Sequence, residues 1–218
     1  METMTLKHLT AIFALAFLAL PAWAEGIDVP PPQVSEEAVK QAIKSYVDTL
    51  WQGKDAKIYW ELNFDALSEE AKTREKRYWG GRTALGVLAL LYAGEDPQTD
   101  RMQEILKWLA EIDMEATYIT GIRSSVWSKL HKPEYKPLLA RDAKTLMGST
   151  MRNGKISGYF SYMPAPTSSS GGDHSNTQFG VLGMWAAATA RLETEKDYWK
   201  LVNAHWLKFQ RPDGVLGE

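Results

Sequence analysis

The chain has 218 residues, of which 44% are hydrophobic and 24% are charged, a balance that is ordinary for a globular protein and excludes intrinsic disorder as its main state. Its formal net charge of −2 gives no electrostatic reason to expect nucleic acid or an anionic membrane surface as a partner. The sequence contains no cysteine, which excludes disulfides, thiolate metal ligands and a cysteine nucleophile.

The N-terminus has the three-part layout of a secretion signal. A weakly positive start precedes the apolar run 9–20, and the small residues at 22 and 24 fit a cleavage site. Twelve helical residues extend about 18 Å, which is short of the ~30 Å hydrocarbon core of a bilayer. The sequence therefore predicts residues 1–24 as a signal peptide. Cleavage after Ala24 would leave a periplasmic or extracellular chain without a transmembrane anchor.

A short connecting region follows the predicted leader. Three consecutive prolines make residues 25–34 an extended linker. Ser35 is a good N-cap, and apolar residues recur at helical spacing from there to Leu50. Residues 54–77 are mixed in character and predict a turn and one short, charged helix, whose charge run at 72–77 is interpreted as a solvated face.

The rest of the chain predicts three pairs of helices, each with an apolar first helix and an amphipathic second helix. The first helices are expected at Thr83–Ala93, Thr117–Leu130 and Thr177–Ala190, and the second helices at Asp100–Ile112, Leu138–Met147 and Tyr198–Phe209. The first of them is apolar nearly all round and is expected to be buried on most sides. Strand candidates are few, and the best of them, 159–162, is short. We therefore expect stacked helix hairpins with neighbouring, parallel first helices and flanking second helices.

Two local signals refine these helices. Asp100, with Gln103 three residues later, has the pattern of a capping box, and glycines recur at matched places in the first helices, at Gly86, Gly121 and Gly180. Glycine inside a helix costs about 1 kcal/mol relative to alanine. Its recurrence therefore predicts close approach between helices.

The C-terminal segment 206–214, WLKFQRPDG, resembles the QW-type repeat of the squalene cyclase and prenyltransferase families, although Val215 and Leu216 stand where those repeats carry Gly-Trp. The segments 81–85, 92–97 and 175–179 look like an uncharacterised bacterial branch of these terpenoid cyclase-like proteins. The resemblance covers residues 35–218. It implies an all-α fold, an α/α toroid or partial toroid of stacked hairpins, which is expected to be truncated at its C-terminus.

The chemistry of these families is missing from the sequence. It has no DxDD acid motif, no DDxxD magnesium motif, and no cysteine for the Asp-Cys-His zinc site of the protein prenyltransferases. We therefore expect an exported binding domain with a concave apolar and aromatic inner face for a small apolar molecule or an extended ligand. No catalytic residue, cofactor or metal is predicted. An isoprenoid cyclase with its catalytic motif outside this chain is an alternative. A polysaccharide-active (α/α) barrel is less favoured, because two predicted first helices lack Asp and Glu.

Five residues are candidates for lining a ligand site. Tyr118 and Trp185 lie on first helices, which face the central cavity of a toroid, and Asp173, His174 and Asn176 form a polar cluster at a helix start. That cluster also fits helix capping, with Ser175 and Gln178 as a capping box, and we favour this interpretation. A metal site at His174 and His205 lacks a third ligand at a recognisable spacing.

Overall fold

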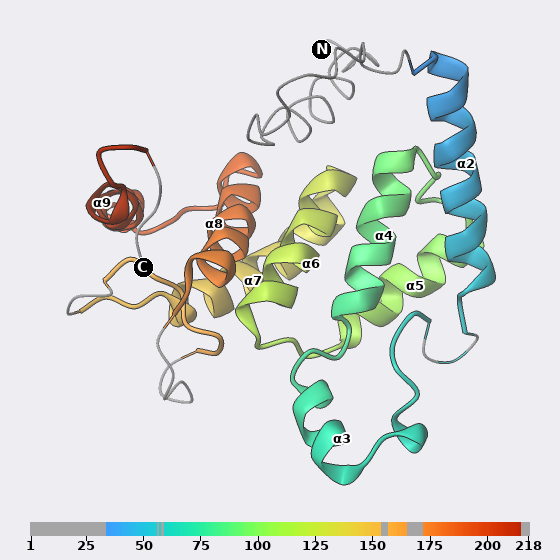
Figure 1. The fold of residues 1–218 in the computed structure, drawn as a ribbon, viewed down its shortest axis with the longest axis horizontal. Coiled ribbons are helices and arrows are strands. Elements are labelled where there is room, and N and C mark those ends of the chain that lie inside the picture. The colour runs from blue at the N-terminus through green and yellow to red at the C-terminus, as the bar shows by residue number, and fades with distance from the viewer. Residues whose placement is uncertain (1–33, 56, 58, 154–156, 165–171, 215–218) are drawn as a thin grey trace, which may run out of the picture. The chain divides into compact units, whose positions relative to one another are not determined.

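The computed structural model describes residues 34–55, 57, 59–153, 157–164 and 172–214 (Figure 1). Within these ranges the protein forms α-helices and two short 3₁₀-helices, and no strand. The all-α prediction is thus confirmed for this part of the chain, whereas the predicted signal peptide 1–24 lies outside it. The elements are α2 (Glu36–Gln52), η1 (Phe64–Ala66), α3 (Glu69–Lys76), α4 (Gly81–Ala93), α5 (Asp100–Glu111), α6 (Thr117–Leu130), η2 (Pro133–Tyr135), α7 (Lys136–Ser149), α8 (His174–Thr189) and α9 (Tyr198–Phe209).

Contacts within the chain divide it into two units, residues 1–39 and 40–218, and the arrangement described below belongs to the second unit. Each of the six paired helices is present there, and its ends differ from the predicted ones by at most three residues. None of the helices in the described ranges combines the length and the apolar character that crossing a bilayer requires.

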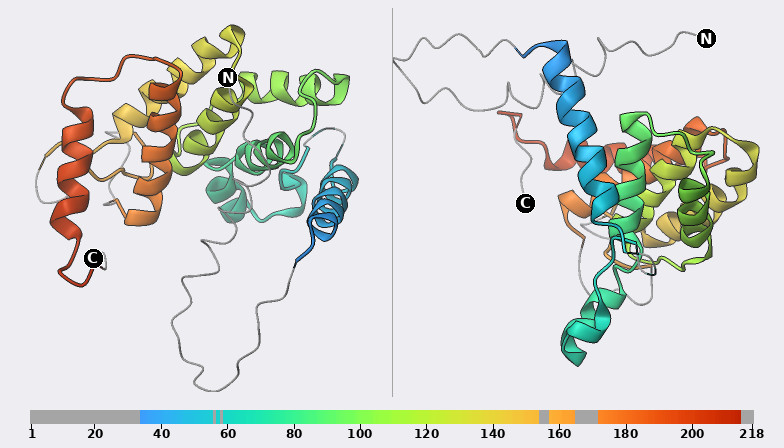
Figure 2. Two further views of the ribbon diagram at one scale, coloured as in Figure 1. Left: turned by 90° about the horizontal axis from the view of Figure 1, so that it is seen from above. Right: turned by 90° about the vertical axis from the view of Figure 1, so that its right-hand side faces the viewer.

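The three first helices, α4, α6 and α8, lie next to one another in that order (Figures 1 and 2). The N-terminal ends of all three helices lie along the same edge of this row. Gly81 at the start of α4 and Tyr118 at the start of α6 line one pocket, and the starts of α6 and α8 both hydrogen-bond the carbonyl oxygen of Ser161. The helices therefore run in parallel, as the sequence predicted.

Two of the three second helices, α5 and α7, pack against this row, whereas the predicted flanking position of the third, α9, is not found. Helix α5 contacts α4, and α7 contacts both α6 and α8, so that α5 and α7 cover one side of the row (Figure 2). Helix α9 is anchored differently, through aromatic contacts with the segment that precedes α8. The ring of Tyr198 lies 6.5 Å from that of Phe160, and the ring of His205 lies 4.0 Å from that of Tyr159.

Helix α4 is buried on most sides, as its apolar sequence predicted, but one side of it is exposed. Ala84, Val87 and Leu91 are buried against the neighbouring helices, but Leu85 and Tyr92 are 51% and 55% exposed. These two residues are seven apart, so they lie on the same side of the helix, and no helix of the described ranges covers that side. The uncovered apolar side of α4 is therefore a surface feature that the sequence did not reveal.

Glycines permit close helix contact between α6 and α8. A Cβ atom added to Gly121 would lie 2.2 Å from the carbonyl oxygen of Phe179, and one added to Gly183 would lie 2.8 Å from the Cα atom of Gly121. The predicted role is therefore confirmed for Gly121. At Gly86 and Gly180 it is wrong, because an aromatic ring occupies the space there, from Trp60 and Phe160 respectively.

Several predicted details at element ends are also wrong. Thr99, not Asp100, is the N-cap of α5, and the Gln103 side chain hydrogen-bonds the carbonyl oxygen of Pro97 instead of completing a capping box. The strand candidate at 159–162 forms no strand and has one isolated bridge, between Phe160 and Thr150. Its backbone carbonyl groups instead accept hydrogen bonds from residues at the starts of α6 and α8.

A buried ion pair ties three helices together, and nothing in the sequence indicated it. The guanidinium of Arg123 on α6 makes two hydrogen bonds with the carboxylate of Asp142 on α7, of 2.9 and 2.5 Å. Its remaining nitrogen donates to the carbonyl oxygens of Leu109 and Ile112 at the end of α5. This pair satisfies backbone acceptors that the helix end would otherwise leave without partners.

Candidate functional site

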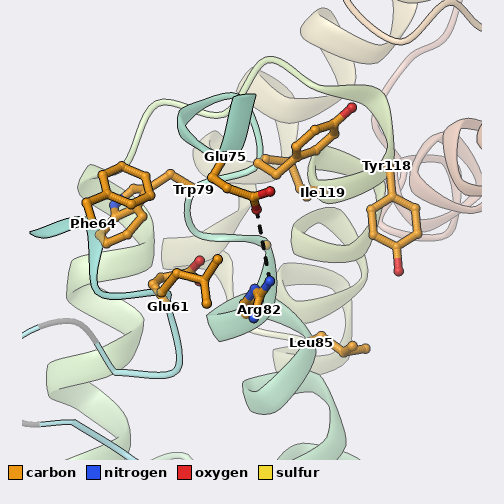
Figure 3. Close-up of a pocket in the computed structure, with 11 residues that line it drawn as sticks. Glu61, Phe64, Glu75, Trp79, Arg82, Leu85, Tyr118 and Ile119 are labelled. Carbon is orange, nitrogen blue, oxygen red and sulfur yellow. Dashed lines mark ion pairs between the residues drawn. The ribbon is translucent and has the colours of Figure 1, made fainter. Parts of the chain in front are cut away.

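A pocket of about 330 Å³ opens at the N-terminal ends of α4 and α6 (Figure 3). Aromatic rings form much of its wall, and two glutamates and one arginine supply its charges. We call it the aromatic pocket. It is lined by Glu61, Leu62, Phe64, Glu75, Tyr78, Trp79, Gly81, Arg82, Leu85, Tyr118 and Ile119.

Glu61 holds one wall of the aromatic pocket in place. Helix α4 begins after Gly80, which has no side chain that could cap it, and the Glu61 carboxylate accepts the N–H of Thr83 at 2.8 Å in place of an N-cap. Burial raises the pKa of Glu61, although the backbone N–H groups at the helix start oppose that rise. This bond fixes the segment before α3, so that the ring of Phe64 packs 4.6 Å from that of Trp79.

An arginine and a glutamate face each other across the opening. Nη2 of Arg82 on α4 lies 4.0 Å from Oε2 of Glu75 on α3, the pair that the dashed line in Figure 3 marks. This distance exceeds that of a hydrogen bond, so the two groups attract one another with a gap between them. Glu75 also pairs with Arg74 at 3.2 Å. The charges at the opening therefore largely balance.

The aromatic pocket continues into an exposed apolar surface on the side of the row that α5 and α7 leave uncovered. Leu85 and Tyr118 belong to both, and the ring of Tyr118 lies 4.2 Å from that of Phe179 on α8. Further along α8, Leu182 and Trp185 are exposed. We call this surface the open apolar face; it consists of Leu85, Tyr92, Tyr118, Phe179, Leu182 and Trp185.

Of the five residues predicted to line a site, Tyr118 and Trp185 lie on the open apolar face. Asp173 is the N-cap of α8 and accepts the N–H of Asn176 at 2.6 Å, so capping is confirmed, but Asp173 performs it rather than the predicted Ser175. Its carboxylate also accepts hydrogen bonds from the hydroxyls of Tyr162 and Ser175.

The surroundings of Asp173 favour its ionised form. Burial alone raises the pKa of this carboxyl, but the hydrogen bonds from Tyr162, Asn176 and Ser175 together outweigh burial and hold the pKa below its usual value. A carboxyl with a lowered pKa is a poor proton donor at neutral pH. The geometry therefore gives Asp173 a structural role at the helix start.

His174 and Asn176 lie away from the open apolar face. His174 packs in an aromatic cluster with Tyr159 and the α9 residues His205, Trp206 and Phe209, at ring distances of 5.0 to 5.6 Å. Asn176 is buried, and its amide donates to the carbonyl oxygen of Ser161 at 2.8 Å. The structure therefore separates the predicted residues into two places.

The aromatic cluster makes the stability of the protein depend on pH. Burial lowers the pKa of His205, and the nearby His174 lowers it further. Because the unfolded state then binds a proton more readily than the folded state, stability is expected to fall as the pH drops through about 6.5. Urea unfolding of the protein and of His205→Gln between pH 8 and 5.5 measures this. The wild-type midpoint should fall more than the variant's, and equal falls would contradict the assignment.

Sequence reasoning missed most of the aromatic pocket. Glu75 belongs to the charge run interpreted as a solvated face, yet its side chain is partly buried at the pocket opening. Trp79 and Arg82 flank the start of α4, and Phe64 belongs to a short 3₁₀-helix. The one signal in the sequence for this pocket was the aromatic residue Trp79, which lies among charged residues.

The described residues hold no metal-binding group, and a second cavity lies apart from the aromatic pocket. Among the described residues, no group of three or more His, Asp or Glu side chains could hold a metal ion. A second cavity, of about 610 Å³, lies between α7, α8 and residues 192–195, and a salt bridge of 2.5 Å between Arg152 and Glu195 lies in its wall. None of the five residues that were predicted to line a ligand site lines this second cavity.

Comparison with protein-family models, with curated proteins and with solved structures finds no match to this chain.

Proposed function

We propose that this protein is an exported α/α-toroid repeat protein that binds an apolar ligand on the open apolar face. The observation that carries the proposal is the exposure of large apolar side chains on three adjacent helices, which are Leu85 of α4, Tyr118 of α6, and Leu182 and Trp185 of α8. Contiguous apolar surface of this kind marks ligand or partner sites in soluble proteins.

The arrangement of the helices supports the toroid part of the proposal. Parallel first helices in a row, with the second helices α5 and α7 on one side of it, are what successive hairpins of a toroid require. In such a fold the uncovered side of the first helices is the inner face. The resemblance of residues 206–214 to the squalene cyclase and prenyltransferase repeat points in the same direction, and the leader-like residues 1–24 support export.

The proposal is for binding rather than catalysis. Cyclisation of an isoprenoid by alkene protonation needs a strongly acidic group that is held where water is excluded. Asp173 has a lowered pKa and is the N-cap of α8, and both properties oppose its use as such an acid. We therefore expect no turnover of squalene or of a polyprenyl diphosphate by this chain.

Removing the largest exposed ring tests the proposal. Trp185→Ser should weaken binding of farnesol, an apolar probe, by about tenfold to a hundredfold, because burying such a ring contributes about 1.5–3 kcal/mol. Isothermal titration calorimetry measures this without relying on tryptophan fluorescence. Since Trp185 is 61% exposed, the variant should keep the stability of the wild type within about 0.5 kcal/mol.

The control is a residue of similar exposure away from the open apolar face. Leu207 on α9 is 63% exposed, and Leu207→Ser should leave farnesol binding unchanged. Equal losses in the two variants would indicate nonspecific adsorption. Undetectable binding of farnesol to the wild type would contradict the proposed function.

A further inference from the structure

The aromatic pocket and the open apolar face form one continuous surface of two different characters. Leu85 lines the pocket and is exposed on α4, and Tyr118 lines the pocket and contacts the ring of Phe179 on α8. One end of the surface is therefore a pocket with charged side chains among its aromatic rings, whereas the other end is apolar and open. A ligand that fills both must itself have a polar end and an apolar end.

The charges of the aromatic pocket do not favour a charged ligand. Glu75 and Arg82 face each other, so a cation attracted by one is repelled by the other, and the reverse holds for an anion. Glu61, the remaining charged residue of the lining, already accepts an N–H group at the start of α4, where the helix dipole is positive. The pocket therefore offers no uncompensated charge to a ligand.

The gap between Glu75 and Arg82 suits a hydroxyl group. A hydroxyl both donates and accepts hydrogen bonds, so one placed beside the pair, about 2.8 Å from each of the two atoms, could donate to the carboxylate and accept from the guanidinium. The 4.0 Å between Nη2 and Oε2 leaves them without a direct hydrogen bond to break. The rings of Tyr78, Trp79 and Tyr118 line the same pocket, and the two tyrosines bring further hydroxyls to it.

Resting on the proposed function, we propose that the ligand is an amphiphile with an uncharged, hydroxyl-bearing head group. The head group occupies the aromatic pocket, between Glu75 and Arg82, and the apolar chain runs along the open apolar face past Tyr118 toward Trp185.

Three probes with the same chain and different heads test this. Octyl glucoside, octyltrimethylammonium and octyl sulfate are titrated into the protein by calorimetry, each below the concentration at which it forms micelles. The glucoside should bind at least about tenfold more tightly than either charged probe. In Arg82→Met this preference over octyltrimethylammonium should fall below about threefold, because Glu75 then loses one of the two arginines that oppose its charge. Arg211→Met is the matched control, since side chains 82 and 211 are 54% and 60% exposed.

Each outcome separates this inference from the proposed function. If all three probes bind equally and Trp185→Ser weakens each of them, the open apolar face stands and the head-group inference is overturned. Tighter binding of a charged probe, or an unchanged preference in Arg82→Met, also overturns the inference. If no probe binds, the proposed function itself fails. Circular dichroism of each variant shows that a loss of binding is not a loss of folding.

Discussion

Asp142→Ala is expected to lower the free energy of unfolding by about 3–5 kcal/mol, which is a large share of the stability of a domain of this size. The reason is that Arg123 and Asp142 have side chains only 1% exposed. Without Asp142, the guanidinium of Arg123 keeps its charge inside the protein with no anion beside it. The indole N–H of Trp127, which donates to the same carboxylate at 2.9 Å, also loses its acceptor.

Urea unfolding at pH 7, followed by circular dichroism, measures this loss. Asp197→Ala is the matched control, because Asp197 pairs with Lys200 at the surface and its removal should change stability by less than about 0.5 kcal/mol. The double variant Arg123→Met with Asp142→Leu should recover much of the loss, since it removes both buried charges together. A loss below about 1 kcal/mol in Asp142→Ala would show that the pair is not buried as described.

The positions of the helices could be predicted from the sequence because each depends on local signals. Apolar spacing located all six paired helices, and Gly94 marked the end of α4, where it adopts the left-handed conformation with φ of 92°. The order and direction of the first helices could also be predicted, because the second helix of a hairpin returns the chain to the end at which the first helix began. Tyr118 and Trp185 were predicted as surface-lining residues on the same basis.

The aromatic pocket could not be predicted, because it depends on contacts between residues that are distant in the sequence. Glu61 caps a helix that begins twenty residues later, which no local capping pattern can reveal. The pairing of Glu75 with Arg82 depends on where α3 lies relative to α4. The Arg123 and Asp142 pair was missed for the same reason, since each residue alone reads as an ordinary charged position on a helix.

The one exposed side of α4 could not be predicted for a related reason. Its sequence is apolar nearly all round, and composition cannot tell a helix surrounded by protein from one that carries an exposed binding surface. Leu85 and Tyr92 lie on the uncovered side of the helix. An apolar side chain there does not gain the stability that burial in the core would give it. Such residues are therefore the informative exceptions in an otherwise consistent helix.

Gly121→Ala is expected to destabilise the protein by about 2 kcal/mol, although alanine favours a helix over glycine by about 1 kcal/mol. The added Cβ would lie 2.2 Å from the carbonyl oxygen of Phe179 and 2.8 Å from its carbonyl carbon. These atoms belong to the backbone of α8, so no side-chain rotation can relieve the overlap. Helices α6 and α8 must then move apart, which loosens the contacts on which the row of first helices depends.

Gly148→Ala is the matched control, with an expected change of opposite sign. Gly148 is exposed on α7, and a Cβ there would lie 3.7 Å from Cβ of Pro164, an ordinary contact. It should therefore stabilise the protein by up to about 1 kcal/mol through helix propensity alone. The midpoints of urea unfolding of the two variants should move in opposite directions from the wild type. A Gly121→Ala variant as stable as Gly148→Ala would mean that α6 and α8 do not pack as closely as this structure has them.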